Sequence, residues 1–201
     1  MSYSEFNLKR VKKEFGIKLI EEKGIFYKVD PASPSDILIK ILEDNVPLAL
    51  AINTEKARSE LIISTVLLEI KRIFKKDVSF FSGIEFNVDK EKGLGGYCDF
   101  MLSASSEQLI LSAPVVVIVE AKNENIIGGI GQCIAEMFAA QLFNRQEKNE
   151  LQKIYGVVTS GNIWKFLKME EQEVHIDLQD YYIENIKKIL GILIAMIKQI
   201  A

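Results

Sequence analysis

The chain has 201 residues, of which 48% are hydrophobic and 26% are charged, and its formal net charge is −3. A chain this long and apolar buries enough surface to offset its ordering entropy, which excludes an intrinsically disordered protein. With 12 glycines and 4 prolines, a collagen-like or low-complexity class is also excluded. The acidic balance argues against binding nucleic acid through bulk charge alone, but it leaves room for a local basic cleft.

The two cysteines, Cys98 and Cys133, lie far apart and form no CxxC pattern, and His175 is the only histidine. These residues match no familiar zinc-site spacing, so we expect free or buried thiols in a reducing compartment. The N-terminus lacks a signal core, and the longest apolar run, Ile189 to Ile197, is nine residues. A membrane span needs about 20 residues. The sequence therefore predicts a soluble, cytoplasmic protein with no membrane association.

Residues 1–53 are interpreted as an N-terminal elaboration of a single domain, 1–201. Residues 4–29 predict a helix followed by extended chain, and basic residues cluster on that helix between Lys9 and Lys13. Pro31 and Pro34 bias their neighbours away from helix. A short helix is expected over 36–44, capped by Ser35 or Ser33.

The core of the domain, residues 54–160, begins with a helix predicted over 56–76 behind the N-cap Thr54. At 100° per residue Glu60 falls on the apolar side of this helix, between Leu67 and Ala57. A carboxylate there needs a reason, because an unpaired buried charge is costly. The helix ends in a basic group, 71–76, where cations favour the helix dipole.

Two β-prone runs, 78–88 and 97–102, flank a Gly-rich segment and predict a hairpin. Residues 115–119 are five consecutive Val and Ile residues, typical of a central strand covered on both faces. That strand ends at Glu120-Ala121-Lys122. A helix to about Asn144 and a strand over 153–159 then predict a right-handed crossover between parallel strands.

The glycines at 128, 129 and 131 precede that helix. Backbone amides there can cradle a phosphate, but the run matches no nucleotide-binding motif. A flexible entry to the helix is the favoured interpretation.

Residues 161–201 predict a hairpin, from 164–169 and 174–178, and a terminal helix over 181–200. The helix has more apolar surface than one core-facing stripe needs, so we expect core packing plus a partial homodimer contact. The whole pattern predicts an α/β fold, with a mixed central sheet flanked by helices and helical additions at both ends.

Chemistry-bearing residues gather at the end of the central strand. Glu120 and Lys122 share one face, because side chains alternate along a strand. The hairpin can set Asp99 on the neighbouring strand beside Glu120. Two adjacent carboxylates repel unless a cation neutralises them, and oxygen ligands select Mg²⁺ or Mn²⁺. A nearby lysine can then orient water or neutralise developing charge.

Asp99 followed by Glu120-Ala121-Lys122 on a hydrophobic strand resembles the PD-(D/E)XK nuclease superfamily, which has the restriction-endonuclease-like fold. The resemblance covers roughly residues 56–160, and the full chain also resembles a bacterial family assigned to this fold. One departure is Cys98, where the family often has Pro.

The resemblance implies that Asp99, Glu120 and the Ala121 carbonyl bind the metal. It further implies that Lys122 is the catalytic lysine, Glu60 an accessory acid and Gln132 a supporting helix residue. The expected function is Mg²⁺- or Mn²⁺-dependent hydrolysis of phosphodiester bonds in nucleic acid, with DNA favoured over RNA. Two alternatives stay open. One is a catalytically silent module of the same fold that binds nucleic acid or protein, and the other is a metal-independent structural protein that dimerises.

Overall fold

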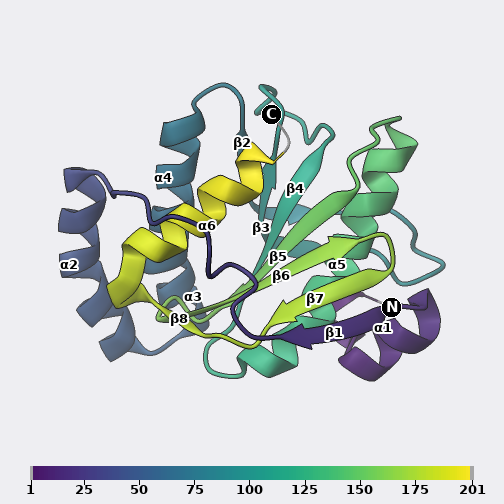
Figure 1. Cartoon of the computed structure of the whole chain (residues 1–201), viewed down its shortest axis with the longest axis horizontal. Coiled ribbons are helices and arrows are strands. Elements are labelled where there is room, and N and C mark those ends of the chain that lie inside the picture. Colours follow the sequence, from purple (N-terminus) through teal and green to yellow (C-terminus); the bar gives the residue numbers. More distant parts are fainter. Residues whose placement is uncertain (1, 200–201) are drawn as a thin grey trace.

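The computed structural model describes residues 2–199, which form a mixed eight-stranded sheet flanked by helices (Figure 1). The strand order is β1-β7-β6-β5-β4-β3-β2, and β8 pairs with β6. The β4–β5 and β1–β7 pairs are parallel, and the other pairs are antiparallel. The strands are β1 (Lys18–Glu22), β2 (Ser79–Glu85), β3 (Tyr97–Ser103), β4 (Val115–Ala121), β5 (Lys153–Thr159), β6 (Ile163–Glu170), β7 (Glu173–Asp177) and β8 (Tyr181–Tyr182).

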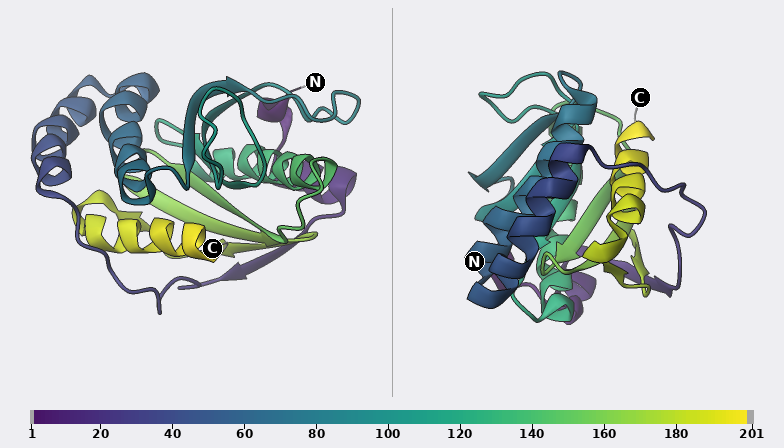
Figure 2. Two further views of the ribbon diagram at one scale, coloured as in Figure 1. Left: turned by 90° about the horizontal axis from the view of Figure 1, so that it is seen from above. Right: turned by 90° about the vertical axis from the view of Figure 1, so that its left-hand side faces the viewer.

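Helices cover both faces of the sheet and create two hydrophobic cores. The helical elements are η1 (Tyr3–Glu5), α1 (Leu8–Phe15), α2 (Asp36–Ile52), α3 (Glu55–Arg58), the π-helical turn η2 (Ser59–Ile63), α4 (Ser64–Phe74), α5 (Ile126–Gln146), η3 (Ile183–Asn185) and α6 (Ile186–Lys198). The first core joins α2, η2, α4 and α6 to one face, and the second joins α1 and α5 to the other. Figure 2 shows α5 and α6 on opposite sides of the sheet. The predicted α/β class with a mixed, helix-flanked sheet is confirmed.

Strand β4 lies in the middle of this arrangement. All seven of its residues are buried, as expected for β-branched side chains covered on both faces. The parallel pairing of β4 with β5 confirms the predicted crossover through α5. The end of β4, where Glu120 and Ala121 lie, is therefore held by a strand on each side.

The helix predicted over 36–44 extends further than predicted, to Ile52. Helix α2 begins after its N-cap Ser35, whose side chain accepts a hydrogen bond from the Leu38 amide, and it runs through Pro47 to Ile52. Proline removes one helical hydrogen bond. Burial of Ala49 beyond Pro47 continues the apolar face that starts at Leu38, so tertiary packing outweighs the local cost.

The interpretation of the glycine run as a flexible entry is wrong, because these glycines lie inside α5. A Cβ at residue 131 would lie 2.4 Å from the Cα atom of Asn7, and a Cβ at 129 would lie 2.9 Å from a Val158 methyl. Glycine is needed at both positions so that the chain before α1 and strand β5 can approach α5.

The two ends of the chain add to the sheet and its layers. Strand β1 pairs with β7 at one sheet edge, and α1 contacts α5. Helix α6 begins at Ile186 rather than at 181, because Tyr181–Tyr182 pairs with β6, and Ile200 lies outside the described residues. Six apolar side chains of α6 are buried in the first core. The core part of the prediction for this helix is confirmed, and the homodimer contact stays a prediction.

Helix α5 is long and apolar enough to cross a membrane by length and composition alone. However, 67% of its most apolar 18-residue window is buried inside the protein, as in the core helix of a soluble protein. Cys133 on α5 and Cys98 on β3 are buried free thiols, as predicted.

Candidate active site

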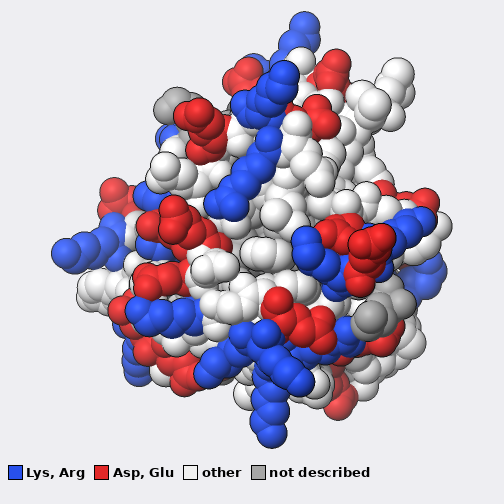
Figure 3. Space-filling model, turned by 90° about the vertical axis from the view of Figure 1, so that its right-hand side faces the viewer, with Lys and Arg blue, Asp and Glu red and all other residues white. Residues whose placement is uncertain are grey.

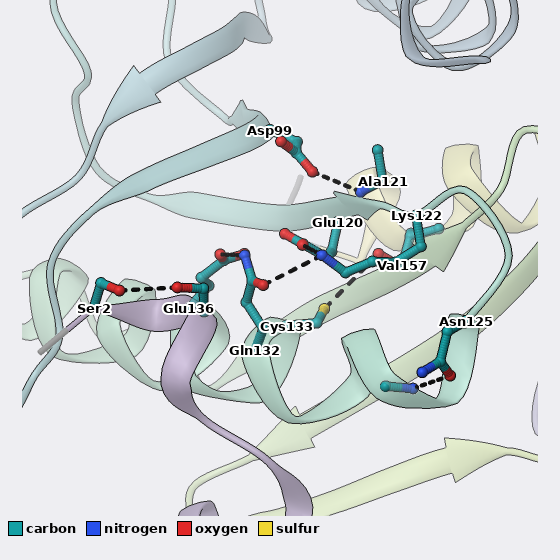
Figure 4. A network of polar contacts seen from close by, with 12 residues as sticks. Ser2, Asp99, Glu120, Ala121, Lys122, Asn125, Gln132, Cys133, Glu136 and Val157 are labelled. Carbon is teal, nitrogen blue, oxygen red and sulfur yellow. Dashed lines mark hydrogen bonds and ion pairs between the residues drawn. The ribbon is translucent and has the colours of Figure 1, made fainter. Parts of the chain in front are cut away.

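The predicted carboxylates meet where β3 and β4 run side by side. Phe100 pairs with Val119, and extending this antiparallel register by one residue sets Asp99 opposite Glu120. The backbone amide of Ala121 donates a hydrogen bond of 2.8 Å to Asp99 Oδ2. Figure 4 shows both carboxylates beside the end of β4. The structure thus brings together the first two residues of the predicted site.

Lys122 lies on the same side as Glu120, as side-chain alternation predicted. Its ammonium donates to Glu120 Oε1 and, at 3.3 Å, to Gln132 Oε1 on α5 (Figure 4). The Glu120 side chain is 1% exposed, whereas that of Lys122 is 24% exposed. Glu120 Oε2 is buried without a hydrogen-bond partner among the described residues. The pair therefore joins a buried carboxylate to an amine that reaches solvent.

Burial dominates the electrostatics of the site. It raises the pKa of Glu120 to about 8, and the negative charge of Asp99 adds to this rise. Burial also raises the pKa of Asp99, although the Ala121 amide and the Lys122 ammonium oppose the rise. For Lys122, burial favours the neutral amine, but the Glu120 carboxylate outweighs it and leaves the pKa above its ordinary value. Both carboxyl groups thus bind protons more tightly than usual, and a bound cation would lower their pKa values.

A cleft of about 500 Å³ opens beside Asp99 and Ala121, between strands β2 and β3 and the helix that starts at Glu55. Glu60 lines it, but the prediction that Glu60 falls on an apolar helix side is wrong. Its side chain is 61% exposed and pairs with Lys56 at 2.7 Å. The reason is the wide turn η2 (Ser59–Ile63), which adds a residue to the turn and shifts the helical phase.

Sequence reasoning missed Glu55, the first residue of α3, which also lines the cleft. Its negative charge raises the pKa values of Asp99, Glu120 and Lys122. Arg58 holds this helix start at the sheet end by donating to the Ser160 carbonyl at 3.0 Å. The sequence signal that could have revealed Glu55 is its place in the first turn of the helix, directly after the N-cap Thr54.

Sequence reasoning also missed Glu136, one helical turn after Gln132 on α5. Gln132 Nε2 donates to Glu136 Oε1 at 3.1 Å. Glu136 is fully buried, and burial together with the charge of Glu120 raises its pKa well above the ordinary value. The i, i+4 spacing of the two residues was the signal that could have revealed this contact.

The oxygen atoms available at the site are of the kind that Mg²⁺ prefers as ligands. Asp99 and Glu120 supply carboxylate oxygens, the Glu120 Oε2 atom has no hydrogen-bond partner among the described residues, and Ala121 lines the cleft. Among residues 2–199, no group of three Asp, Glu, His or Cys side chains is arranged to hold a metal. Mg²⁺ commonly binds through one or two carboxylates and retains several waters, so two carboxylates are sufficient.

The surface charge is mixed. On the face in Figure 3, Lys and Arg side chains lie among Asp and Glu side chains, with a group of basic side chains at the lower end. Of the predicted basic residues, Lys71 donates to the carbonyls of Lys75 and Val78 and so terminates α4. Arg10 pairs with Glu14 at 2.7 Å. Lys9, Lys12 and Lys13 of α1 remain exposed.

Comparison with known proteins found no matching family model and no matching curated protein.

Proposed function

We propose that this protein is a Mg²⁺- or Mn²⁺-dependent nuclease that hydrolyses phosphodiester bonds in nucleic acid, with a restriction-endonuclease-like core. The observation that carries the proposal is the pair of carboxyl groups, with Glu120 buried and Asp99 half-buried, and the Lys122 ammonium beside Glu120. The order of elements from α3 to β5, with a helix, three antiparallel strands and a crossover helix, also agrees with this core.

Asp99, Glu120 and the Ala121 carbonyl would hold the ion. When bound, it would supply a Lewis acid for the phosphoryl oxygen and lower the pKa of bound water. The carboxyl groups would release their protons to become ligands, because a cation removes the repulsion that raises their pKa values. Glu55 and Glu60 would supply further acidic groups on the opposite wall of the cleft.

Lys122 would orient the attacking water or neutralise charge on the reacting phosphate. Glu120 Oε1 and Gln132 Oε1 accept two of its N–H groups, and among the described residues this leaves the third available to water or substrate. The ammonium thus contacts the Glu120 carboxylate and acts on Asp99 through its charge, and the Lys122 side chain stays partly exposed.

We propose DNA rather than RNA as the substrate and the cytoplasm as the location. The free, buried thiols Cys98 and Cys133 suit a reducing compartment. The exposed lysines of α1, Lys9, Lys12 and Lys13, are the proposed phosphate-backbone contacts.

The test is a cleavage assay with linear, nicked and single-stranded DNA and RNA, in Mg²⁺, in Mn²⁺ and in chelator. We expect metal-dependent cleavage that Asp99→Ala and Lys122→Ala each abolish. Glu173→Gln is the matched control, because Glu173 is an exposed residue of β7 paired with Lys18. Cleavage that survives both site substitutions would show that the activity belongs to another site or another protein.

A catalytically silent module of the same fold is the second candidate. The net charge of −3 and the mixed surface favour it, because a nucleic-acid enzyme gains from a continuous positive face. Calorimetry with Mg²⁺ separates the two. Failure of folded protein to bind Mg²⁺ at millimolar concentration supports the silent module.

A further inference from the structure

Glu136 is a buried acidic side chain that metal binding and phosphoryl chemistry do not use. It is 0% exposed and lies on α5, in the core between this helix and the sheet. Its Oε1 atom accepts from Gln132, whereas Oε2 is buried with no partner among the described residues. Burying an unpartnered carboxyl oxygen destabilises a fold. A methionine of similar length would avoid this cost, so packing alone does not explain a glutamate here.

The contacts of Glu136 lead to the active site through one side chain. Glu136 accepts from Gln132 Nε2 at 3.1 Å, Gln132 Oε1 accepts from Lys122 Nζ at 3.3 Å, and Lys122 also donates to Glu120. Figure 4 shows these four side chains in sequence between the end of β4 and helix α5. The row links the core of the protein to the reactive ammonium.

These hydrogen bonds define which end of the Gln132 side-chain amide faces Lys122. An amide has a donor end and an acceptor end, and only the acceptor end suits an ammonium. Gln132 Nε2 donates to Glu136 Oε1, so the NH₂ end of Gln132 faces Glu136. The oxygen end then faces Lys122. Without an acceptor at 136, the amide could turn and present NH₂ to the ammonium.

We propose that Glu136 is a positioning residue that orients the Gln132 amide so that its oxygen holds the Lys122 ammonium beside Glu120. The proposal rests on the proposed nuclease function for its catalytic consequence, but the orientation itself is independent of activity. Packing against α5 also helps to hold Lys122 in place. A Cβ at Gly129 would lie 3.0 Å from Lys122 Cγ and Cε, so the lysine stem already runs against α5.

Two substitutions of similar size separate orientation from simple packing. Glu136→Gln keeps a carbonyl oxygen that accepts from Gln132, whereas Glu136→Met removes the acceptor and fills the space. The first measurement is the side-chain amide NMR signal of Gln132, assigned by its loss in Gln132→Leu. We expect Glu136→Gln to keep the chemical shifts and slow hydrogen exchange of this amide, and Glu136→Met to lose both.

The wild-type protein provides a test that needs no variant. Gln152 is exposed, so its amide gives the exchange rate of a free glutamine side chain. We expect Gln132 NH₂ to exchange at least about 10-fold more slowly. Equal rates for the two amides would overturn the proposal even if Glu136→Met did not fold.

The second measurement is steady-state cleavage kinetics. Glu136→Met should lower kcat by about 10- to 100-fold, as loss of outer-shell partners does at comparable sites, with KM within about 2-fold. Glu136→Gln should stay within about 3-fold of wild type. In a Gln132→Leu background, Glu136→Met should have no further effect on kcat.

The outcomes separate the two proposals. An unchanged Gln132 amide signal in Glu136→Met overturns the positioning role, whatever the activity is. A lost signal in a protein whose wild type cleaves nothing supports the orientation and contradicts the nuclease. Additive effects of Gln132→Leu and Glu136→Met on kcat would overturn the route through Gln132.

Discussion

The Asp99 carboxylate accepts a 2.8 Å hydrogen bond from the backbone amide of Ala121, the residue that follows Glu120. This contact fixes a side chain of β3 to the backbone of β4 at the point where their regular pairing ends. The distance between the two acidic groups is therefore set by the sheet rather than by a flexible loop. A site built in this way needs little rearrangement to bind an ion.

Asp99→Asn should preserve the fold and weaken metal binding. An asparagine oxygen still accepts from the Ala121 amide, but the negative charge is lost. We expect Mg²⁺ affinity to fall by at least about 10-fold in calorimetry, with the thermal midpoint nearly unchanged. Unaltered affinity would exclude Asp99 as a ligand.

The metal-free protein should lose stability as pH rises from about 5 to 8.5. The folded-state pKa of Glu120 is raised by burial and by Asp99 to about 8, above its ordinary value of 4.5. The folded state therefore binds this proton more tightly than the unfolded state within that window. Urea unfolding in chelator should show a decrease in the free energy of unfolding, to which Glu120 contributes at most about 4 kcal/mol.

Two comparisons check the origin of that slope. Glu120→Gln should reduce the dependence of the free energy of unfolding on pH but not abolish it, because Glu136, whose pKa is also raised, still contributes. Saturating Mg²⁺ should restore stability at the alkaline end, since it replaces the proton. An identical slope in wild type and Glu120→Gln would assign the pH dependence to other groups.

Glu55→Gln should affect the site more than Glu60→Gln. The charge of Glu55 acts on Asp99, Glu120 and Lys122, whereas Glu60 is 61% exposed and paired with Lys56. We expect Glu55→Gln to lower metal affinity or kcat by roughly 10-fold and Glu60→Gln by less than about 2-fold. The reverse order would favour Glu60 over Glu55 as the accessory acid that the family resemblance implies.

Gly131→Ala should destabilise the protein. The added Cβ would lie 2.4 Å from Asn7 Cα and 2.6 Å from Asn7 C, and backbone atoms cannot move aside cheaply. We expect a loss of about 1–3 kcal/mol in the free energy of unfolding, measured by urea titration. Ile127→Ala on the exposed side of α5 is the control and should cost little. Equal stability of Gly131→Ala and wild type would show that α1 and α5 separate readily.

Much of the fold was predictable from local pattern. Five consecutive β-branched residues after Pro114 make a strand buried on both faces, since no helix or surface strand suits that composition. Side-chain alternation then requires Glu120 and Lys122 to share a face. The hairpin before this strand then sets Asp99 on the neighbouring strand beside Glu120.

The sequence by itself determined the type and order of most elements, the central strand and the chemical identity of the residues at its end, because these depend on neighbours in the chain. Only the tertiary structure decided how the two helix acids lie at the cleft, since both line it, but Glu60 is exposed and paired with Lys56 whereas the charge of Glu55 acts on Asp99. It likewise decided that the α5 glycines allow close packing and that Glu136 is linked to Lys122 through Gln132. These features depend on the approach of segments far apart in sequence, which local periodicity cannot encode.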